Sequence, residues 1–185
     1  MVMDDVVIRA QAGDRAAFEA IAAASVHRLY GIASRVLRDP DAAEDAVQDC
    51  LVRAWRDLRA LRDTARLDAW LYRLLVNACR DQQRRQPRRL AELGPVAHAV
   101  AAPVDSIADV DRRDQIQRGF LRLTAEHRMV LVLHHFLGLR PAEIADLLGI
   151  PVGTATSRMH YGARALRSAI EADLVPTAVE TGTRS

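Results

Sequence analysis

The sequence contains no lysine, few aromatic residues and no long run of apolar residues. Its 26 basic side chains are all arginines, and aromatic residues make up 4% of the chain. A helix that crosses a membrane needs about 20 mainly apolar residues in a row, so we expect no membrane span. The N-terminal Met-Val-Met-Asp-Asp also lacks the basic and apolar segments of a signal peptide. We therefore expect a cytoplasmic protein.

Cysteine is equally scarce, because Cys50 and Cys79 are the only two. They lack the spacing of a metal site, and buried thiols in a reducing cytosol are the simpler interpretation, with a redox pair as the alternative. The adjacent His134 and His135 diverge by about 100° on a helix and do not chelate one ion together. With no nucleophile–base pair and no phosphate loop either, we expect no metal, no cofactor and no enzymatic activity.

Only nine glycines occur, and no segment alternates apolar and polar residues as a strand does. We therefore predict an all-α fold. Asp39 followed by Pro40 is a typical helix start, and Thr124 is a good cap for another helix. The expected helices cover residues 4–12, 14–37, 40–60, 64–86, 106–122 and 125–137, followed by two shorter ones.

Residues 87–106 show no periodicity and contain Pro87, Gly94, Pro95 and Pro103, which is typical of a flexible linker. The sequence thus predicts two small helical domains. The expected division is 1–86 for the first domain, 87–106 for the linker, 107–170 for the second domain and 171–185 for a C-terminal tail.

The segment from Glu143 to Tyr161 has the pattern of a helix-turn-helix. Ile144, Leu147 and Leu148 recur at helical spacing, and Gly149 is suited to end that helix. The second helix of such a unit reads base edges in the DNA major groove. It contains no acid between Asp146 and Glu171, although an ordinary helical hairpin remains an alternative. The candidate DNA-contacting residues are Thr154, Thr156, Ser157, Arg158, His160, Tyr161 and Arg164.

Four motifs in order make the chain resemble the sigma factors of bacterial RNA polymerase. They are Ala43-Glu44-Asp45 with Gln48 and Trp55; Ala69-Trp70-Leu71 with Arg73 and Asn77; Leu123-Thr124 with Glu126; and Glu143-Ile144-Ala145 with Gly153, Ser157 and Arg158. The chain looks most like the extracytoplasmic-function group, which keeps only sigma regions 2 and 4. The resemblance covers roughly residues 14–170.

This resemblance implies that the first domain binds the polymerase. In the family, the helix from Glu44 to Trp55 docks on the β′ clamp, while region 4 meets the β flap. An outward polar face suits a basic partner and sets its register. The residues that the resemblance assigns to this contact are Glu44, Asp45, Gln48 and Asp49, for which a solvated acidic face is the alternative.

The resemblance also implies that the next helix engages the promoter −10 element as the DNA melts. Melting requires aromatic platforms for unstacked bases and cations for the exposed strand. Tyr72 and Asn77 are candidates for flipped bases, whereas Trp70 has the spacing of a core residue. The candidates for phosphate contact are Arg73, Arg80, Arg84 and Arg85.

In region 4 the resemblance assigns recognition of the −35 element to the outer face of the second helix. Two departures stand out. Thr156 occupies a position at which many relatives have a cation, and Arg140 replaces the usual Ser or Thr cap before Pro141, which predicts a weaker helix start.

The sequence is compatible with three candidate functions. A sigma factor has core polymerase and promoter DNA as partners, and the family usually adds an anti-sigma protein. If the chain were a stand-alone helix-turn-helix regulator, the first domain would have no function. The sequence also shows no obvious helix through which such a regulator would dimerise. A sigma mimic that sequesters an anti-sigma protein is disfavoured by the arginines that face DNA. The sigma factor is the preferred interpretation.

Overall fold

The computed structural model describes residues 2–93, 116 and 118–174. The longer helices in these ranges are α1 (Val2–Gln11), α2 (Arg15–Leu37), α3 (Pro40–Asp57), α4 (Leu67–Leu93), α6 (Ala125–Leu137), α7 (Pro141–Leu148) and α8 (Val152–Leu174). Two short 3₁₀ turns, η1 (Leu58–Ala60) and η2 (Thr64–Arg66), join α3 to α4. No strand occurs in the described part of the chain, so the predicted all-α fold is confirmed.

Side-chain caps fix the starts of three helices. The Asp14 carboxylate accepts a hydrogen bond from the backbone N–H of Ala17 at 3.1 Å, and Asp39 accepts one from Ala42 at the same distance. The Thr124 hydroxyl accepts one from His127 at 3.3 Å. Each such cap contributes about 1 kcal/mol. The starts predicted from Asp39 and Thr124 are therefore present.

The end of α4 differs from the prediction that a linker begins at residue 87. The helix continues through Pro87 to Leu93. A proline inside a helix cannot donate a backbone hydrogen bond, at a cost of about 3 kcal/mol. The flanking arginines, glutamines and leucines are good helix formers, and they extend the helix on both sides of the proline. Residues 94–106 of the expected linker lie outside the described residues, and α8 passes residue 170 to end at Leu174.

Helices α1 to α4 form the first helical bundle, in which α3 packs against both α2 and α4. Leu29, Leu75 and Cys50 are fully buried there. The Cys50 thiol donates to the Leu71 carbonyl at 3.6 Å. Burial raises the pKa of Cys50 and of Cys79 to about 12. Both cysteines are therefore protonated core thiols, in accord with the simpler interpretation of their sequence context.

The second bundle packs α8 across α6 and α7. Ile144 and Ala155 are fully buried, and Leu131 and Leu133 extend the apolar interior. The helical spacing of Ile144 predicted that it lies on the apolar face of the first helix, and its burial confirms that prediction.

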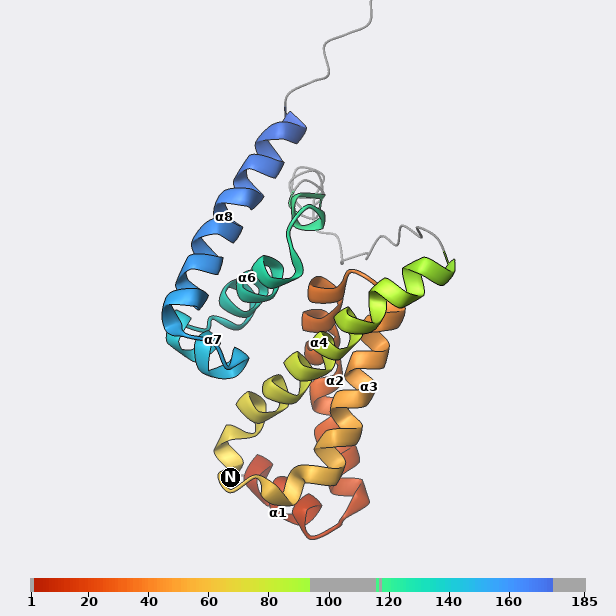
Figure 1. Cartoon of the computed structure of the whole chain (residues 1–185). Helices are drawn as coiled ribbons and strands as arrows, with labels where there is room; N and C mark the ends of the chain where they lie inside the picture. Colours follow the sequence, from red (N-terminus) through yellow and green to blue (C-terminus); the bar gives the residue numbers. More distant parts are fainter. Residues whose placement is uncertain (1, 94–115, 117, 175–185) are drawn as a thin grey trace, which may run out of the picture.

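The two bundles also lie against each other. Helix α2 packs on α6, and α4 packs on α7 (Figure 1). The buried apolar residues of both bundles belong to one continuous cluster, which runs from Leu29 and Leu75 to Val132, Leu133 and Ile144. The interior is thus shared between the two halves of the chain. No described helix combines the length and apolar character that a membrane crossing requires.

Candidate nucleic-acid interface

The turn between α7 and α8 is held by backbone hydrogen bonds. Gly149 ends α7 in the left-handed conformation with φ 63°, which favours glycine. Its N–H donates to the Asp146 carbonyl at 3.3 Å, and the N–H of Ile150 donates to Ala145 at 3.0 Å. This is the turn that the helix-turn-helix pattern predicted.

At the start of α7 the Arg140 side chain makes no capping hydrogen bond, as its identity predicted, but Glu143 adds a contact that the sequence reasoning did not include. The backbone N–H of Arg140 donates to Glu143 Oε2 at 2.8 Å, and the Arg140 guanidinium pairs with the same carboxylate at 2.9 Å. The hydrogen bonds from the Arg140 side chain and backbone lower the pKa of Glu143 to about 2. The expectation considered only the first residue of the motif, whereas Glu143 supplies an acceptor for the Arg140 N–H.

The outer face of α8 carries the residues predicted to read DNA. Thr156 and Ser157 are exposed, and their hydroxyls donate to the backbone carbonyls of Val152 and Thr154 at 3.0 Å each. His160 and Tyr161 are exposed, with ring centroids 5.5 Å apart, and 57% of Tyr161 is accessible. Thr154 is half-buried and Arg164 is exposed.

The Arg158 side chain is less exposed than the sequence pattern predicted. Its side chain is only 24% exposed, and it pairs with Glu126 of α6 at 2.9 Å. The sequence placed it on the outer face with the other polar residues. In the structure it lies at the edge of that face, turned toward α6.

Helix α4 carries the candidates for the −10 element. Tyr72 is half-buried against the core, and the Arg28 guanidinium lies 5.4 Å from its ring centroid. Burial raises the pKa of Tyr72. Asn77 is exposed on the same helix, and Trp70 packs against the core as its spacing predicted.

The four candidate arginines of α4 differ in their contacts. Arg73 pairs with Asp146 of α7 at 2.9 Å, and Arg80 donates to the Leu148 carbonyl at the end of α7, also at 2.9 Å. Arg84 and Arg85 are exposed and have looser pairs at 3.9 Å, with Asp81 and Asp49 respectively. Two of the four are therefore held by the second bundle.

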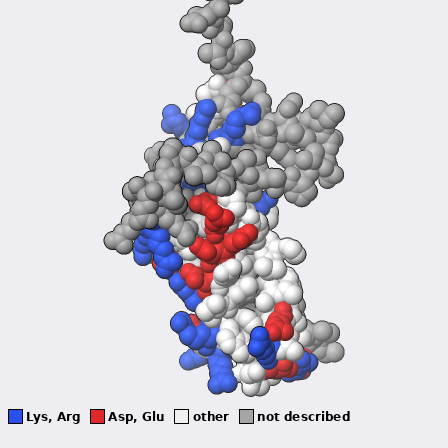
Figure 2. Space-filling view, turned by 90° about the vertical axis from the view of Figure 1, so that its right-hand side faces the viewer, with Lys and Arg blue, Asp and Glu red and all other residues white. Residues whose placement is uncertain are grey.

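An acidic face lies on α3. Glu44 and Gln48 are exposed, whereas Asp45 and Asp49 are half-buried. Figure 2 views the side of the molecule on which α3 lies in Figure 1, and it shows acidic side chains gathered between groups of basic ones. Beyond these acids, Trp55 is 42% exposed and its ring centroid lies 5.0 Å from that of Phe18.

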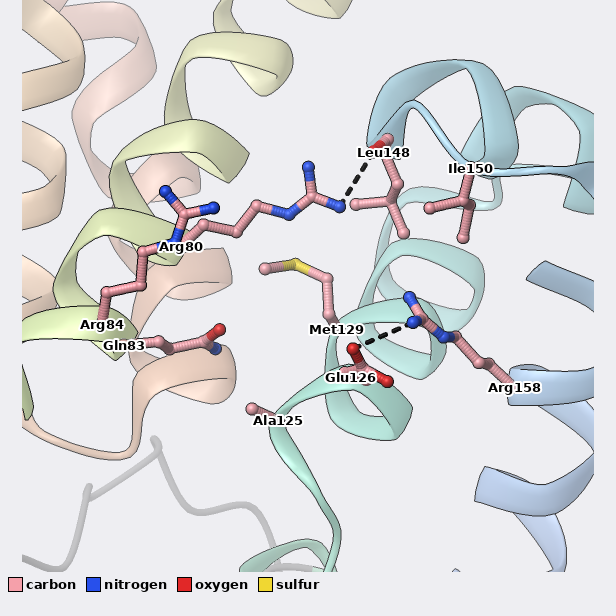
Figure 3. A pocket seen from close by; sticks show the side chains of 9 residues that line it. All are labelled: Arg80, Gln83, Arg84, Ala125, Glu126, Met129, Leu148, Ile150 and Arg158. Atoms are coloured by element: carbon pink, nitrogen blue, oxygen red, sulfur yellow. Dashed lines mark hydrogen bonds and ion pairs between the residues drawn. The ribbon is translucent and has the colours of Figure 1, made fainter. Parts of the chain in front are cut away.

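A pocket of about 380 Å³ opens where α4, α6 and α8 approach one another (Figure 3). Arg80 and Arg84 line it from α4 and Arg158 lines it from α8, and Arg158 pairs with the one carboxylate of the lining, Glu126. Burial lowers the pKa of Arg80, and the positive charges of Arg158 and Arg84 lower it further. The pocket thus brings cations from both candidate DNA faces together.

Three residues at these faces were missed by sequence reasoning: Arg28, Glu126 and Asp146. Each is the partner of a candidate residue, at a separation of 32 to 73 positions. Helical periodicity pairs residues only three or four positions apart. Glu126 stood in a quoted motif, but nothing local linked it to Arg158.

Comparison with known proteins agrees with the motif order. Residues 22–89 match the family described as Sigma-70 region 2, and residues 113–166 match Sigma-70, region 4. The chain is 36% identical over 148 residues to the ECF RNA polymerase sigma factor SigL of Mycobacterium tuberculosis, covering 77% of this chain and 82% of SigL. It is 34% identical over 151 residues to SigM of the same species, covering 80% of this chain and 74% of SigM.

Two solved structures have a fold similar to that of this chain. The sigma factor RpoE, in complex with the anti-sigma factor NepR from Bartonella quintana, is similar with a TM-score of 0.69 and 25% identity, over 84% of this chain and 98% of RpoE. CnrH, in complex with the cytosolic domain of CnrY, is similar with a TM-score of 0.63 and 24% identity, over 94% of this chain and 99% of CnrH.

Proposed function

The chain belongs to the extracytoplasmic-function sigma factors of the sigma-70 family, and from this premise we propose which of its residues carry out promoter selection and opening. The protein is a sigma factor that directs core RNA polymerase to specific promoters and initiates transcription. The observation that carries the residue assignment is the presence of two sets of basic, polar and aromatic side chains, on α4 and on α8, in the two matched regions.

The polymerase contact is proposed for the outer face of α3. Its acidic and amide side chains, Glu44, Asp45, Gln48 and Asp49, would meet a basic surface of the β′ clamp and set the register of docking. Region 4 is proposed to meet the β flap. The exposed ring of Trp55, supported by Phe18, adds an apolar contact beside the acids.

Promoter melting is proposed for α4. Tyr72 offers a ring on which an unstacked base can stack, and Asn77 offers an amide to a base edge. Arg73, Arg80, Arg84 and Arg85 are proposed to hold the phosphates of the exposed strand. Of these, Arg84 and Arg85 are the most accessible in the described structure.

Recognition of the −35 element is proposed for the outer face of α8. Arg158 and Arg164 suit phosphate or guanine, and His160 and Tyr161 offer polar aromatic edges. The oxygens of Thr156 and Ser157 can accept hydrogen bonds while their hydroxyl protons are held by the helix. Thr154 offers a further hydroxyl. Because both DNA contacts act from one polymerase-bound assembly, neither has to be strong alone.

The proposed domains are residues 1–86 for region 2, 87–106 for the linker, 107–170 for region 4 and 171–185 for the tail. Helix α4 then enters the linker by seven residues. The similar structure of RpoE is that of a sigma factor bound to an anti-sigma factor, which supports an anti-sigma partner for this chain. We further propose that the protein acts in the bacterial cytoplasm and performs no enzymatic step of its own.

The test begins with purified core RNA polymerase and the full chain. Pull-down measures the association, and run-off transcription on genomic fragments measures initiation. New start sites that appear only with the chain present support the proposal, and their alignment gives the promoter sequence. A chain that does not bind polymerase but shifts DNA tightly by itself overturns it in favour of a stand-alone regulator.

Single substitutions then test the three proposed contact surfaces, on α3, α4 and α8, one at a time. Reversing charge with Glu44→Arg is expected to weaken polymerase pull-down, whereas Glu19→Arg on α2, which changes net charge equally, is not. Arg85→Ala is expected to slow promoter opening, measured by permanganate reactivity of unpaired thymines, with polymerase binding retained. Arg164→Ala is expected to weaken promoter binding before opening. Loss of polymerase pull-down in Arg85→Ala or Arg164→Ala would contradict the assignment.

A further inference from the structure

The pocket between α4, α6 and α8 holds more positive than negative charge. Three of the side chains that line it, Arg80, Arg84 and Arg158, are cations, and Glu126 is the one carboxylate. Glu126 pairs with Arg158 at 2.9 Å, whereas Arg80 donates to a neutral acceptor, the Leu148 carbonyl. Burial, followed by the charges of Arg158 and Arg84, lowers the pKa of Arg80, so a second anion in the pocket would relieve an unfavourable balance.

The start of α6 brings the positive end of a helix dipole to the same pocket. Ala125 and Glu126, the first two residues of this 13-residue helix, belong to the lining. The first turn of a helix favours anions, because its N–H groups and its dipole both point toward them. The Glu126 carboxylate already lies there, beside Arg158, so the site holds one anionic group of the chain itself.

The amide of Gln83 supplies a donor that is not used. Its Nε2 is buried and has no hydrogen-bond partner among the described residues. Figure 3 shows the Gln83 side chain extending from α4 into the gap, toward α6. A buried donor without a partner destabilises a fold, and an oxygen atom of a bound ligand would satisfy it.

The pocket also has an apolar lining and the volume for a small molecule. Met129, Leu148 and Ile150 contribute the apolar side chains, and Figure 3 shows the Met129 thioether extending into the gap. A thioether makes favourable contacts with aromatic rings, and a guanidinium group stacks on them. The volume of about 380 Å³ lies within the range of about 300–1,000 Å³ that is usual for small-molecule sites.

We propose that this pocket binds a nucleoside diphosphate. Its phosphates lie among the three arginines and the start of α6, its base lies against the apolar lining, and the Gln83 amide donates to a phosphate oxygen. The ligand displaces the Glu126 carboxylate from Arg158. Walls from three helices suit a compact ligand, whereas a nucleic-acid strand needs a groove that is open at both ends. The inference goes beyond the proposed function, because such a site requires neither polymerase nor promoter.

The first experiment titrates GDP and, in parallel, ADP into the full-length chain at low salt, followed by isothermal titration calorimetry. One nucleotide is expected to bind per chain. Inorganic pyrophosphate, which lacks the base, is expected to bind about fivefold more weakly, because it loses the contact of a ring with the apolar lining. Guanosine, which lacks the phosphates, is expected to give no measurable heat at the same concentration.

Two substitutions at residues with no proposed DNA contact test the site in opposite directions. Gln83→Leu removes the amide donor at similar size and is expected to weaken GDP binding about tenfold. Glu126→Gln removes the carboxylate that competes for Arg158 and is expected to strengthen GDP binding up to about fivefold. Glu19→Gln on α2 is the matched control, because Glu19 and Glu126 are both 64% exposed and each pairs with an arginine at 2.9 Å. It is expected to leave the affinity unchanged.

The nucleotide site is refuted if neither GDP nor ADP binds, or if wild type, Gln83→Leu and Glu126→Gln bind GDP equally. A fluorescein-labelled single-stranded 12-mer DNA tests the other source of phosphate. If Gln83→Leu weakens binding of the 12-mer and GDP does not compete with it, the pocket belongs to a strand and the proposal fails. Circular dichroism checks that Gln83→Leu is folded; if it is not, the comparison of Glu126→Gln with Glu19→Gln decides.

Polymerase pull-down and run-off transcription with the same protein keep this result apart from the proposed function. A chain that initiates transcription but binds no nucleotide leaves the sigma function standing and refutes the nucleotide site. A chain that binds GDP with the expected response to both substitutions but does not bind polymerase supports the nucleotide site and refutes the proposed function.

Discussion

The same substitution, glycine to alanine, is expected to have opposite effects at two positions of α8. Gly162 is buried on the inner side of α8, and a Cβ there would lie 3.1 Å from the Cβ of His127 and 3.3 Å from Leu131 Cδ1. Gly153 is exposed in the first turn, with no atom within 4 Å of a Cβ. Neither has a positive φ, so alanine causes no backbone strain at either position.

The magnitudes follow from two competing effects. Replacing a helical glycine by alanine stabilises a helix by about 1 kcal/mol, and by about half of that in the first turn. Overpacking a close contact costs about 1–3 kcal/mol. At Gly162 the nearest atom is attached directly to the α6 backbone and cannot rotate away. We therefore expect Gly162→Ala to lose about 1 kcal/mol, while Gly153→Ala gains about 0.5 kcal/mol.

Urea unfolding of the full chain, followed by circular dichroism, measures both changes as shifts in the midpoint. The two variants differ only in where one methyl group is placed along α8. Equal stabilisation by both would refute the close approach of α8 to α6 at Gly162. An equal loss in both would refute the open surroundings of Gly153.

Two further predictions concern titrating groups. Because burial raises the pKa of Cys50 and Cys79 to about 12, neither thiol should react with Ellman's reagent at pH 8 until urea unfolds the chain; rapid labelling of the native protein would show that the thiols are accessible. Glu143 has a folded pKa of about 2, below its ordinary 4.5, so its stabilisation is complete above about pH 5 and is lost as the pH falls toward 2. The urea midpoints of wild type and Glu143→Gln should therefore differ most near neutral pH and converge toward pH 3, and a constant difference would argue against the Arg140–Glu143 contact.

The sequence predicted those parts of the structure that are set by neighbouring residues. Asp39 and Thr124 cap their helices as expected, and Gly149 makes the turn, because each acts on residues at most a few positions away. The same local reasoning failed at Pro87, where good helix formers on both sides outweigh one proline. At the start of α7 it recognised that Arg140 lacks a capping oxygen but not that Glu143 supplies an acceptor for the Arg140 N–H.

The contacts between the bundles were beyond the sequence pattern. Arg73 and Arg80 were singled out for their charge, but their partners in α7 lie 73 and 68 positions away. No periodicity links such residues; only the packing of α4 on α7 does. The sequence therefore identified the candidate DNA-contacting residues but did not indicate which of them are bound to the second bundle. The roles assigned to them remain predictions.

The interior shared by both bundles has a consequence for hybrid proteins. Exchanging region 4 with that of a relative is an obvious way to redirect a sigma factor to new promoters. In this chain such an exchange also replaces Val132 and Leu133, which belong to the same apolar cluster as the region 2 core, and Phe136 opposite Gly31. A foreign second half leaves gaps or collisions along α2 unless the facing residues of α2 are exchanged with it. The unit that can be transplanted intact is region 4 together with its matching surface on α2.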